Sequence, residues 1–181
     1  VDNPEELNKA YYEAICHSPG VRLICEKFIE GELVTVDGFC FSNGHRSLTV
    51  ASRKYAKGKK PVTTYISYPS DHSAKIKQKL LENHHNVISA LNYKLGHTHG
   101  EYIVTPRGEV YLVECANRGA GVYTSSTINP LLTGIDLNEV FINQCFAKDS
   151  FKISFETNNY MIASAALAFL DLEIGRVLKK I

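Results

Sequence analysis

The sequence lacks an excess of either charge and lacks a long hydrophobic run, and both absences exclude classes of protein. Its 181 residues include 20 basic and 19 acidic side chains, a formal net charge of +1. This near-zero net charge does not favour binding to nucleic acid or to an anionic membrane surface, so neither partner is expected. The longest apolar stretch, Tyr160 to Leu170, is about half of the ~20 residues that a bilayer-spanning helix needs.

Paired cysteines, tryptophan and internal repeats are also missing. The five cysteines are an odd number without C-x-x-C spacing, which favours reduced thiols and a cytoplasmic protein. No basic-then-apolar leader precedes the first predicted helix, so nothing indicates export. The hydrophobic content of 44% and the 18 Tyr and Phe residues exclude a disordered chain. The length favours one domain with a sizeable core.

The chain begins with a strong helix signal and continues as an antiparallel meander. Asn3-Pro4-Glu5-Glu6 supplies a cap, an early proline and a glutamate three residues after the cap, so a helix is predicted to run from there to Ile15. Ser18-Pro19-Gly20 should end it. Runs rich in branched residues then predict strands, the second and third joined at Asn43-Gly44: Val21–Ile29, Leu33–Phe41, Leu48–Ala51 and Val62–Ser67.

The second half of the chain predicts two helices, a hairpin and a final strand. Asp71 is expected to cap a long helix with an apolar stripe through Leu80 and Ile88, and His84 and His85 are expected on its surface. Asp136 is expected to cap a later helix. Residues 160–170 should form a buried strand or, as the second choice, a core helix. The predicted fold class is α+β, a mostly antiparallel sheet flanked by helices.

The hairpin of Tyr102–Thr105 and Val110–Val113 holds the sharpest chemical prediction. With a loop of two or four residues, Glu101 directly faces Glu114. Like charges directly opposite destabilise a strand pair unless a cation lies between them. Asn117 adds an amide oxygen, and such an all-oxygen set suits Mg²⁺ or Mn²⁺. A three-residue loop with a bulge at Gly108 would instead place the glutamates on opposite faces.

Two further segments carry phosphate-binding chemistry. Arg118-Gly119-Ala120-Gly121 follows Asn117 directly, and an arginine fork beside glycines can bind phosphate or carboxylate. A basic loop at residues 52–60 is interpreted first as a solvated surface segment. The cations singled out in it are Arg53, Lys57, Lys59 and Lys60.

Several motifs together resemble the ATP-grasp superfamily of carboxylate–amine ligases, in order and approximate spacing over nearly the whole chain. The matching runs are residues 25–31 (CEKFIEG), Val36-Asp37-Gly38, His99-Gly100-Glu101 and residues 113–119 (VECANRG). The resemblance implies that residues 1–30 are the end of the smaller grasp subdomain, a helix plus a hinge strand. It also implies that residues 31–181 form the larger subdomain.

The resemblance implies a nucleotide site along the hinge strand. Main-chain groups around Lys27 and Ile29, in the run that starts at Glu26, would hydrogen-bond adenine, and Phe28 would lie near the base or in the core. Leu33 stands where relatives often place the ribose-binding acid, so Glu32, or alternatively Glu30, is the substitute.

For the phosphates, the resemblance implies a metal site and an arginine. Glu101, Glu114 and Asn117 match the ligands that hold Mg²⁺ against ATP, with the two glutamates on one face. Arg118 matches the arginine that steadies the γ-phosphate and the acyl-phosphate. The basic loop would approach the acid substrate or the phosphates.

The function implied is an ATP- and Mg²⁺-dependent ligase that forms an acyl-phosphate from a carboxylate and couples it to an amine. Amino-acid ligation is the first expectation and bicarbonate chemistry of the carbamoyl-phosphate-synthase type the second. The glycine-rich phosphate loop and the N-terminal domain of the family are not found, so the chain is expected to be a fragment that is inactive alone. A nucleotide-binding or regulatory module without catalysis is the alternative. The resemblance also allows a homodimer.

Overall fold

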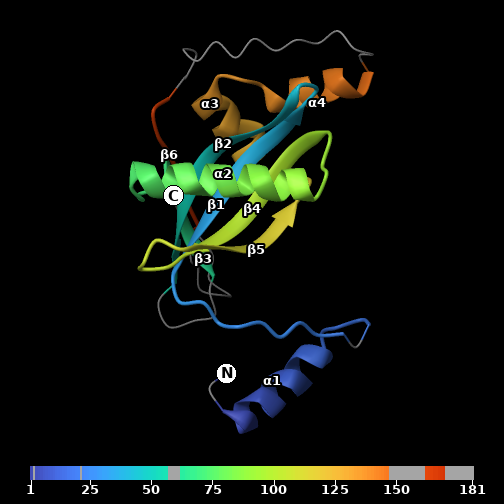
Figure 1. The fold of residues 1–181 in the computed structure, drawn as a ribbon, viewed down its shortest axis with the longest axis vertical. Helices are drawn as coiled ribbons and strands as arrows, with labels where there is room; N and C mark the ends of the chain where they lie inside the picture. Colours follow the sequence, from blue (N-terminus) through green and yellow to red (C-terminus); the bar gives the residue numbers. More distant parts are fainter. Residues whose placement is uncertain (2, 21, 57–61, 147–161, 170–181) are drawn as a thin grey trace, which may run out of the picture.

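The protein is built on a six-stranded sheet in which all neighbouring strands are antiparallel, in the order β5-β4-β1-β2-β3-β6 (Figure 1). The computed structural model describes residues 1, 3–20, 22–56, 62–146 and 162–169. The α+β class with a mostly antiparallel sheet is confirmed. The strands are β1 (Glu32–Phe41), β2 (Gly44–Tyr55), β3 (Thr63–Tyr68), β4 (Gly96–Val104), β5 (Val110–Ala116) and β6 (Ala165–Ala168).

The strands run close to their predicted positions, with one informative extension. The β1–β2 turn falls at residues 42–43, with Gly44 at φ +125°, a conformation that favours glycine. Strand β2 continues to Tyr55, so Arg53, predicted in a loop, lies in a strand of the sheet. The three lysines singled out in that predicted loop, at positions 57, 59 and 60, lie outside the described residues, as do both ends of the strand predicted at 160–170.

Helix α2 (Ala74–Ala90) lies across one face of the sheet (Figure 1). Its cap is Ser73, whose hydroxyl accepts from the Ile76 amide at 3.4 Å, so the prediction of Asp71 as the cap was wrong. The Asp71 amide instead donates to Ser52 Oγ at 3.1 Å, which ties this residue to β2 before the helix begins. The apolar core beneath α2 consists of Val34, Val36, Val50, Leu80, Tyr102 and Val104.

The prediction that His84 is a surface residue was wrong, because its side chain is fully buried under α2. His84 stands four residues after Leu80 and four before Ile88, so it lies on the same inward helix face as these two buried residues. His85, the next residue, is exposed as expected.

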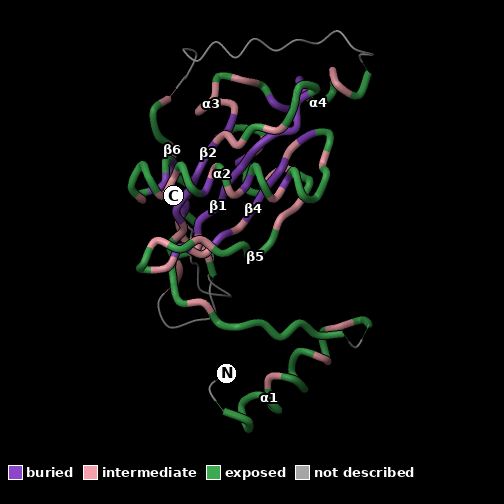
Figure 2. Tube along the Cα trace, in the orientation of Figure 1, coloured by how far each residue is buried: buried purple, intermediate pink, exposed green. Residues whose placement is uncertain are grey.

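Three short helical elements cover part of the opposite face: the π-helical turn η1 (Thr124–Ile128), α3 (Asn129–Thr133) and α4 (Leu137–Phe146). Asp136 caps α4 as predicted, accepting from the amides of Asn138 and Glu139 at 3.0 and 3.1 Å. Phe39 and Phe41 of β1 pack against Leu137 and Val140 of α4. The most buried parts of the chain are therefore the central strands, which have cover on both faces (Figure 2).

Helix α1 (Pro4–Ile15) lies apart from the sheet (Figure 1) and has no buried residue. Its predicted cap is confirmed: Asn3 Oδ1 accepts from the Glu6 amide at 2.9 Å. The strand predicted at 21–29 was wrong over its described part, since residues 22–30 form no ladder. Branched residues favour a strand only where a partner offers hydrogen bonds, and no described strand lies beside this segment. No helix in the described ranges is long and apolar enough to cross a membrane.

Candidate metal and phosphate site

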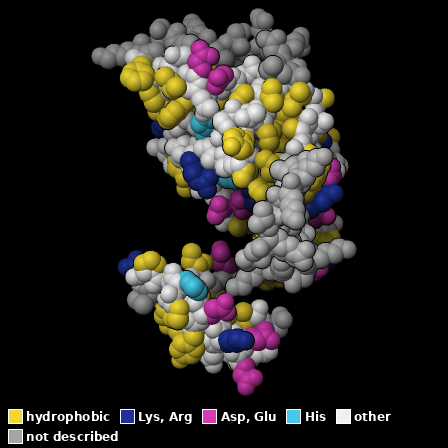
Figure 3. Space-filling model, turned by 180° about the vertical axis from the view of Figure 1, so that it is seen from behind, with side chains coloured by type: hydrophobic (Ala, Val, Ile, Leu, Met, Phe, Trp, Pro, Cys, Tyr) yellow, Lys and Arg dark blue, Asp and Glu magenta, His cyan; other side chains and the backbone are white. Residues whose placement is uncertain are grey.

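The β4–β5 hairpin places Glu101 and Glu114, the glutamate pair, directly opposite each other, as predicted. Paired residues of an antiparallel ladder project from the same face. This is the face opposite α2, because the neighbouring residue Tyr102 points into the core under that helix. Figure 3 views that side of the molecule and shows acidic, basic and histidine side chains gathered on it.

The hairpin combines features of the two alternatives predicted from the sequence: it has a three-residue loop, and Glu101 still faces Glu114. Next to the loop, Val104 pairs with Val110 and Tyr102 with Leu112, which is the register of a three-residue loop. Gly108 occupies the left-handed position of that loop at φ +75°. Val113 is then an extra residue on β5, and this bulge moves Glu114 opposite Glu101. Without the bulge, Glu101 would face Val113.

Asn117 follows β5 with its amide orientation fixed by the backbone of the neighbouring strand. Its Nδ2 donates to the carbonyl oxygens of Leu95 and His97 at 3.0 and 2.8 Å, so both amide hydrogens are used. No described residue donates a hydrogen bond to its side-chain oxygen, so this oxygen can serve as an acceptor or a ligand. Two carboxylates and one amide oxygen fit the preferences of Mg²⁺ or Mn²⁺. Within the described ranges, no three His, Cys, Asp or Glu residues group as a metal cluster, so this ligand set stays a prediction.

Glu101 is held by two basic side chains. Arg53 Nη2 lies 2.8 Å from Glu101 Oε1, and His99 Nε2 lies 3.7 Å from the same oxygen. The contact with His99 lowers the pKa of Glu101, burial opposes that change, and Arg53 lowers the pKa further. Glu101 is therefore a carboxylate at neutral pH, the state that a hard cation requires.

Asp37 and His99 support Glu101 from within the sheet. They are cross-strand partners on β1 and β4, with His99 Nδ1 2.7 Å from Asp37 Oδ1. Tyr68 donates its hydroxyl to Asp37 Oδ2 at 3.4 Å. Burial lowers the pKa of His99, but the hydrogen bond to Asp37 and the ion-pair contact with Glu101 outweigh burial and raise it to about 9.

Asp37, His99, Glu101 and Arg53 thus form a row of alternating charge, the charge row, across β1, β2 and β4. The sequence motifs included Asp37 and His99, but neither residue was assigned a role from the sequence. The available signal was the alternation in β1, where buried Val34 and Val36 point to α2 and Asp37 therefore points to the other face.

The family follows from a comparison of sequences. The sequence description of the ATP-grasp domain matches residues 2–126, which is more than half of the chain. The chain belongs to the ATP-grasp family. The matched range includes the charge row, the glutamate pair, Asn117 and Arg118. A comparison with curated proteins finds no match.

Solved structures of ATP-grasp enzymes share the fold. The L-amino acid ligase from Bacillus licheniformis aligns with a TM-score of 0.76 and 20% identity, over 92% of this chain and 40% of the ligase. A biotin carboxylase from Campylobacter jejuni aligns with a TM-score of 0.68 and 20% identity, over 83% of this chain and 34% of that enzyme. A phosphoribosylglycinamide synthetase from Anaerococcus prevotii aligns with a TM-score of 0.60 and 20% identity, over 78% and 36%. The chain thus spans well under half the length of these enzymes.

The structure does not bring Arg118 into contact with the glutamate pair. Arg118 is exposed, and its Nη1 donates to the carbonyl oxygen of its neighbour Gly119 at 3.0 Å. Gly119 is needed there, because a Cβ atom at this position would lie 2.6 Å from Ser125 Oγ. The loop is therefore packed closely against η1, while the arginine head faces solvent.

The predicted nucleotide residues are exposed along residues 22–32. Glu26 and Lys27 face solvent, Ile29 is half-buried, and Phe28 is 87% exposed, so its alternative placement in the core was wrong. Glu32 begins β1, where its Oε2 lies 3.3 Å from His72 Nε2. Among the described residues, no hydrogen bond or ion pair joins residues 26–29 to the glutamate pair. Their nucleotide roles stay predictions.

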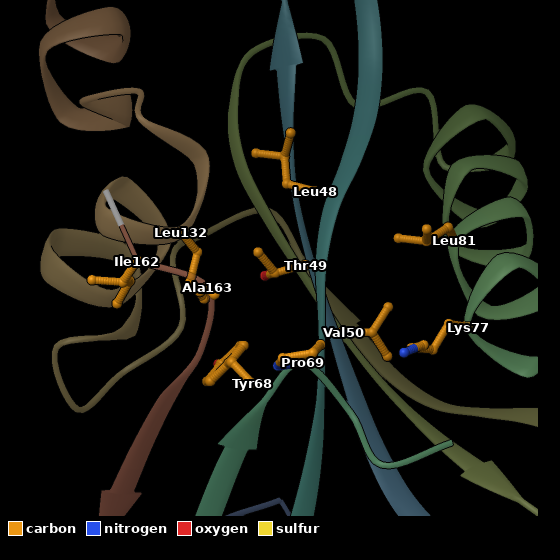
Figure 4. Close-up of a pocket in the computed structure, with 10 residues that line it drawn as sticks. All are labelled: Leu48, Thr49, Val50, Tyr68, Pro69, Lys77, Leu81, Leu132, Ile162 and Ala163. Atoms are coloured by element: carbon orange, nitrogen blue, oxygen red, sulfur yellow. The ribbon is translucent and has the colours of Figure 1, made fainter. Parts of the chain in front are cut away.

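A separate cavity of about 590 Å³ opens where β2 and β3 diverge (Figure 4). It lies between α2 and α3, with Leu81 and Lys77 on one side and Leu132 on the other (Figure 4). Its lining is mostly apolar and contains none of the predicted site residues. The polar chemistry of the protein is therefore at the glutamate pair and the charge row, outside this cavity.

Proposed function

We propose that this chain carries the metal-binding part of an ATP-dependent carboxylate–amine ligase. The observation that carries the proposal is the direct pairing of Glu101 and Glu114, because two carboxylates opposite each other call for a cation. Asn117 completes an oxygen set for Mg²⁺ or Mn²⁺ at the same end of the hairpin.

The reaction would proceed in two displacements. The oxygen of a carboxylate attacks the γ-phosphorus of ATP, the bond to the bridging oxygen breaks, and an acyl-phosphate and ADP form. The nitrogen of an amine then attacks the acyl carbon, and inorganic phosphate leaves as the amide bond forms. A bound divalent cation would neutralise charge on the transferring phosphoryl group.

The chain's own residues would contribute orientation and charge. Glu101 would be held in place through its contact with His99, which is itself fixed by Asp37. Arg118, which follows Asn117 in the sequence and has an exposed head, would reach the γ-phosphate and the acyl-phosphate. Main-chain groups of residues 26–29 would bind adenine, and Glu32 the ribose. Residues 1–30 would belong to the smaller grasp subdomain and 31–181 to the larger one.

The L-amino acid ligase from Bacillus licheniformis aligns over 92% of this chain, and its name supports the proposal of an amino acid as one substrate. We propose a small amino-acid-like carboxylate and an amine as the pair that is joined. A screen of ATP-dependent phosphate release against amino-acid pairs and bicarbonate, with the complete ligase and Mg²⁺, would identify them. Release only with bicarbonate would contradict the amino-acid assignment.

The metal site is tested by titrating the chain with Mn²⁺ and following free Mn²⁺ by electron paramagnetic resonance. Glu114→Gln should weaken Mn²⁺ binding by at least about tenfold, a loss that even outer-shell substitutions can cause. Glu109→Gln is the matched control, because it removes the same charge from the loop end of the same hairpin. Equal Mn²⁺ affinity in wild type and Glu114→Gln would contradict the proposed function.

A further inference from the structure

Arg53 is a partly buried cation placed directly on one of the proposed metal ligands. Its Nη2 lies 2.8 Å from Glu101 Oε1, and the two side chains are only 16% and 18% exposed. We propose that the Arg53 guanidinium competes with the divalent cation for Glu101. It would hold the carboxylate when the metal is absent and turn to an anion when the metal binds. This inference rests on the proposed function.

The Arg53 guanidinium and a divalent cation cannot both bind Glu101 Oε1 without a large electrostatic cost. A divalent cation bound to Oε1 would come within a few ångströms of the guanidinium. In a partly buried site, repulsion between such charges is screened only weakly. The row of Asp37, His99, Glu101 and Arg53 is neutral as it stands. Adding a divalent cation beside Glu114 leaves a positive site, which an anion such as a phosphoryl oxygen would neutralise.

The guanidinium also has an unused donor. Arg53 Nε is buried and has no hydrogen-bond partner among the described residues. A buried donor without an acceptor is costly, so Glu101 alone does not satisfy this side chain. An arginine presents its donors in a planar fork that suits a tetrahedral oxyanion. The same side chain can therefore exchange a carboxylate for a phosphate or sulfate group.

Lys54 provides a control from the same strand. It is the next residue on β2, so its side chain leaves the opposite face of the sheet, and its Nζ lies 5.5 Å from the centre of the Tyr65 ring. Lys54→Gln removes one positive charge at nearly the same sequence position. It leaves the contact with Glu101 intact.

The test is a Mn²⁺ titration of the 181-residue chain followed by electron paramagnetic resonance. Arg53→Gln should bind Mn²⁺ about tenfold more tightly than wild type, because Glu101 no longer has an internal cation. Arg53→Lys and Lys54→Gln should both stay near the wild-type affinity. An arginine with a purely structural role would give the opposite sign, since its loss would loosen the site. Equal or weaker binding by Arg53→Gln would overturn the inference.

A second measurement keeps the wild-type chain and uses sulfate as the probe anion. Because coupling between two ligands is reciprocal, Mn²⁺ should tighten sulfate binding to wild type about fivefold and leave that of Arg53→Gln unchanged. Sulfate binding independent of Mn²⁺ in wild type would overturn the inference even if Arg53→Gln failed to fold. Mn²⁺ binding by neither chain would overturn the proposed metal site as well. Mn²⁺ binding of equal strength in both would overturn only the competition.

Discussion

Two buried histidines lie on opposite faces of the same sheet and hold opposite charge states. His84, under α2, has its Nδ1 2.9 Å from the Tyr102 hydroxyl and its Nε2 3.0 Å from Thr98 Oγ1. Burial, followed by the nearby His45, lowers the pKa of His84 to about 3. His99, on the other face, contacts Asp37 and has a pKa raised to about 9. At neutral pH, His84 is neutral and His99 is a cation.

The difference shows that burial makes a histidine neutral here and that a carboxylate partner reverses this effect. Hydroxyl groups satisfy a neutral imidazole, so the face under α2 can close as a core without ions. A carboxylate at 2.7 Å favours the imidazolium, which places a fixed positive charge behind Glu101. The face that carries Glu101 thus keeps charged side chains beside the predicted ligand site, and the face under α2 serves stability.

The largest expected effect comes from removing the charged histidine. His99→Leu leaves the Asp37 carboxylate buried with only the Tyr68 hydroxyl as a described partner. Removing one partner of a buried ion pair should lower the free energy of unfolding by about 3 kcal/mol. Urea unfolding of wild type and variant measures the difference.

The double variant Asp37→Leu/His99→Leu separates a lost charge partner from lost packing. With no carboxylate left to compensate, the double variant should be more stable than His99→Leu alone, because replacing both ions with apolar groups is often close to neutral. If the double variant is the less stable of the two, the ion pair does not explain the stability.

The pH dependence of stability should separate the two faces next. The folded pKa of His99, about 9, lies above its unfolded value near 6.5. Its contribution is complete below about pH 6.5 and lost as pH rises through about 9, roughly 3 kcal/mol in all, because each unit of pKa difference corresponds to about 1.4 kcal/mol. Urea unfolding at several pH values between 6.5 and 9.5 should show this decline in wild type and a much smaller one in Asp37→Leu/His99→Leu. A flat wild-type profile would contradict an imidazolium at His99.

Features of the site that lie within one hairpin could be predicted from the sequence. Features that depend on strands far apart in the sequence could be predicted less well. The glutamate pairing could be predicted because both residues belong to one hairpin. The bulge at Val113 could not, since alternation does not show which residue a strand leaves unpaired. Asp37 and His99 are 62 positions apart and meet only through the β1–β4 ladder. Their contact requires the strand order, which motifs did not supply.

His84 was misplaced for a different reason. The buried helix face was predicted from apolar residues alone, so a histidine was not considered for it. The spacing of His84 from Leu80 and Ile88 nevertheless indicated the correct face. For residues 22–30, branched side chains predicted a strand, but a ladder also needs a neighbour. Sequence patterns thus predicted which face a residue occupies better than which partner it meets.

The smallest effect is expected on the neutral side of the comparison. His84→Leu keeps an apolar side chain under α2 but leaves the Tyr102 hydroxyl, buried at 1% exposure, without its described partner. The free energy of unfolding should fall by about 1–2 kcal/mol, the cost of one unsatisfied polar group partly offset by apolar burial. Replacement by leucine thus costs less stability at His84 than at His99, because it leaves no buried ion without a partner.

His85→Leu is the control. This neighbour is exposed, and its contact with His45 is a long 3.4 Å. A change in the free energy of unfolding of less than about 0.5 kcal/mol is therefore expected in urea unfolding. A loss at His84 equal to that at His99 would mean that packing, and not charge, governs both faces.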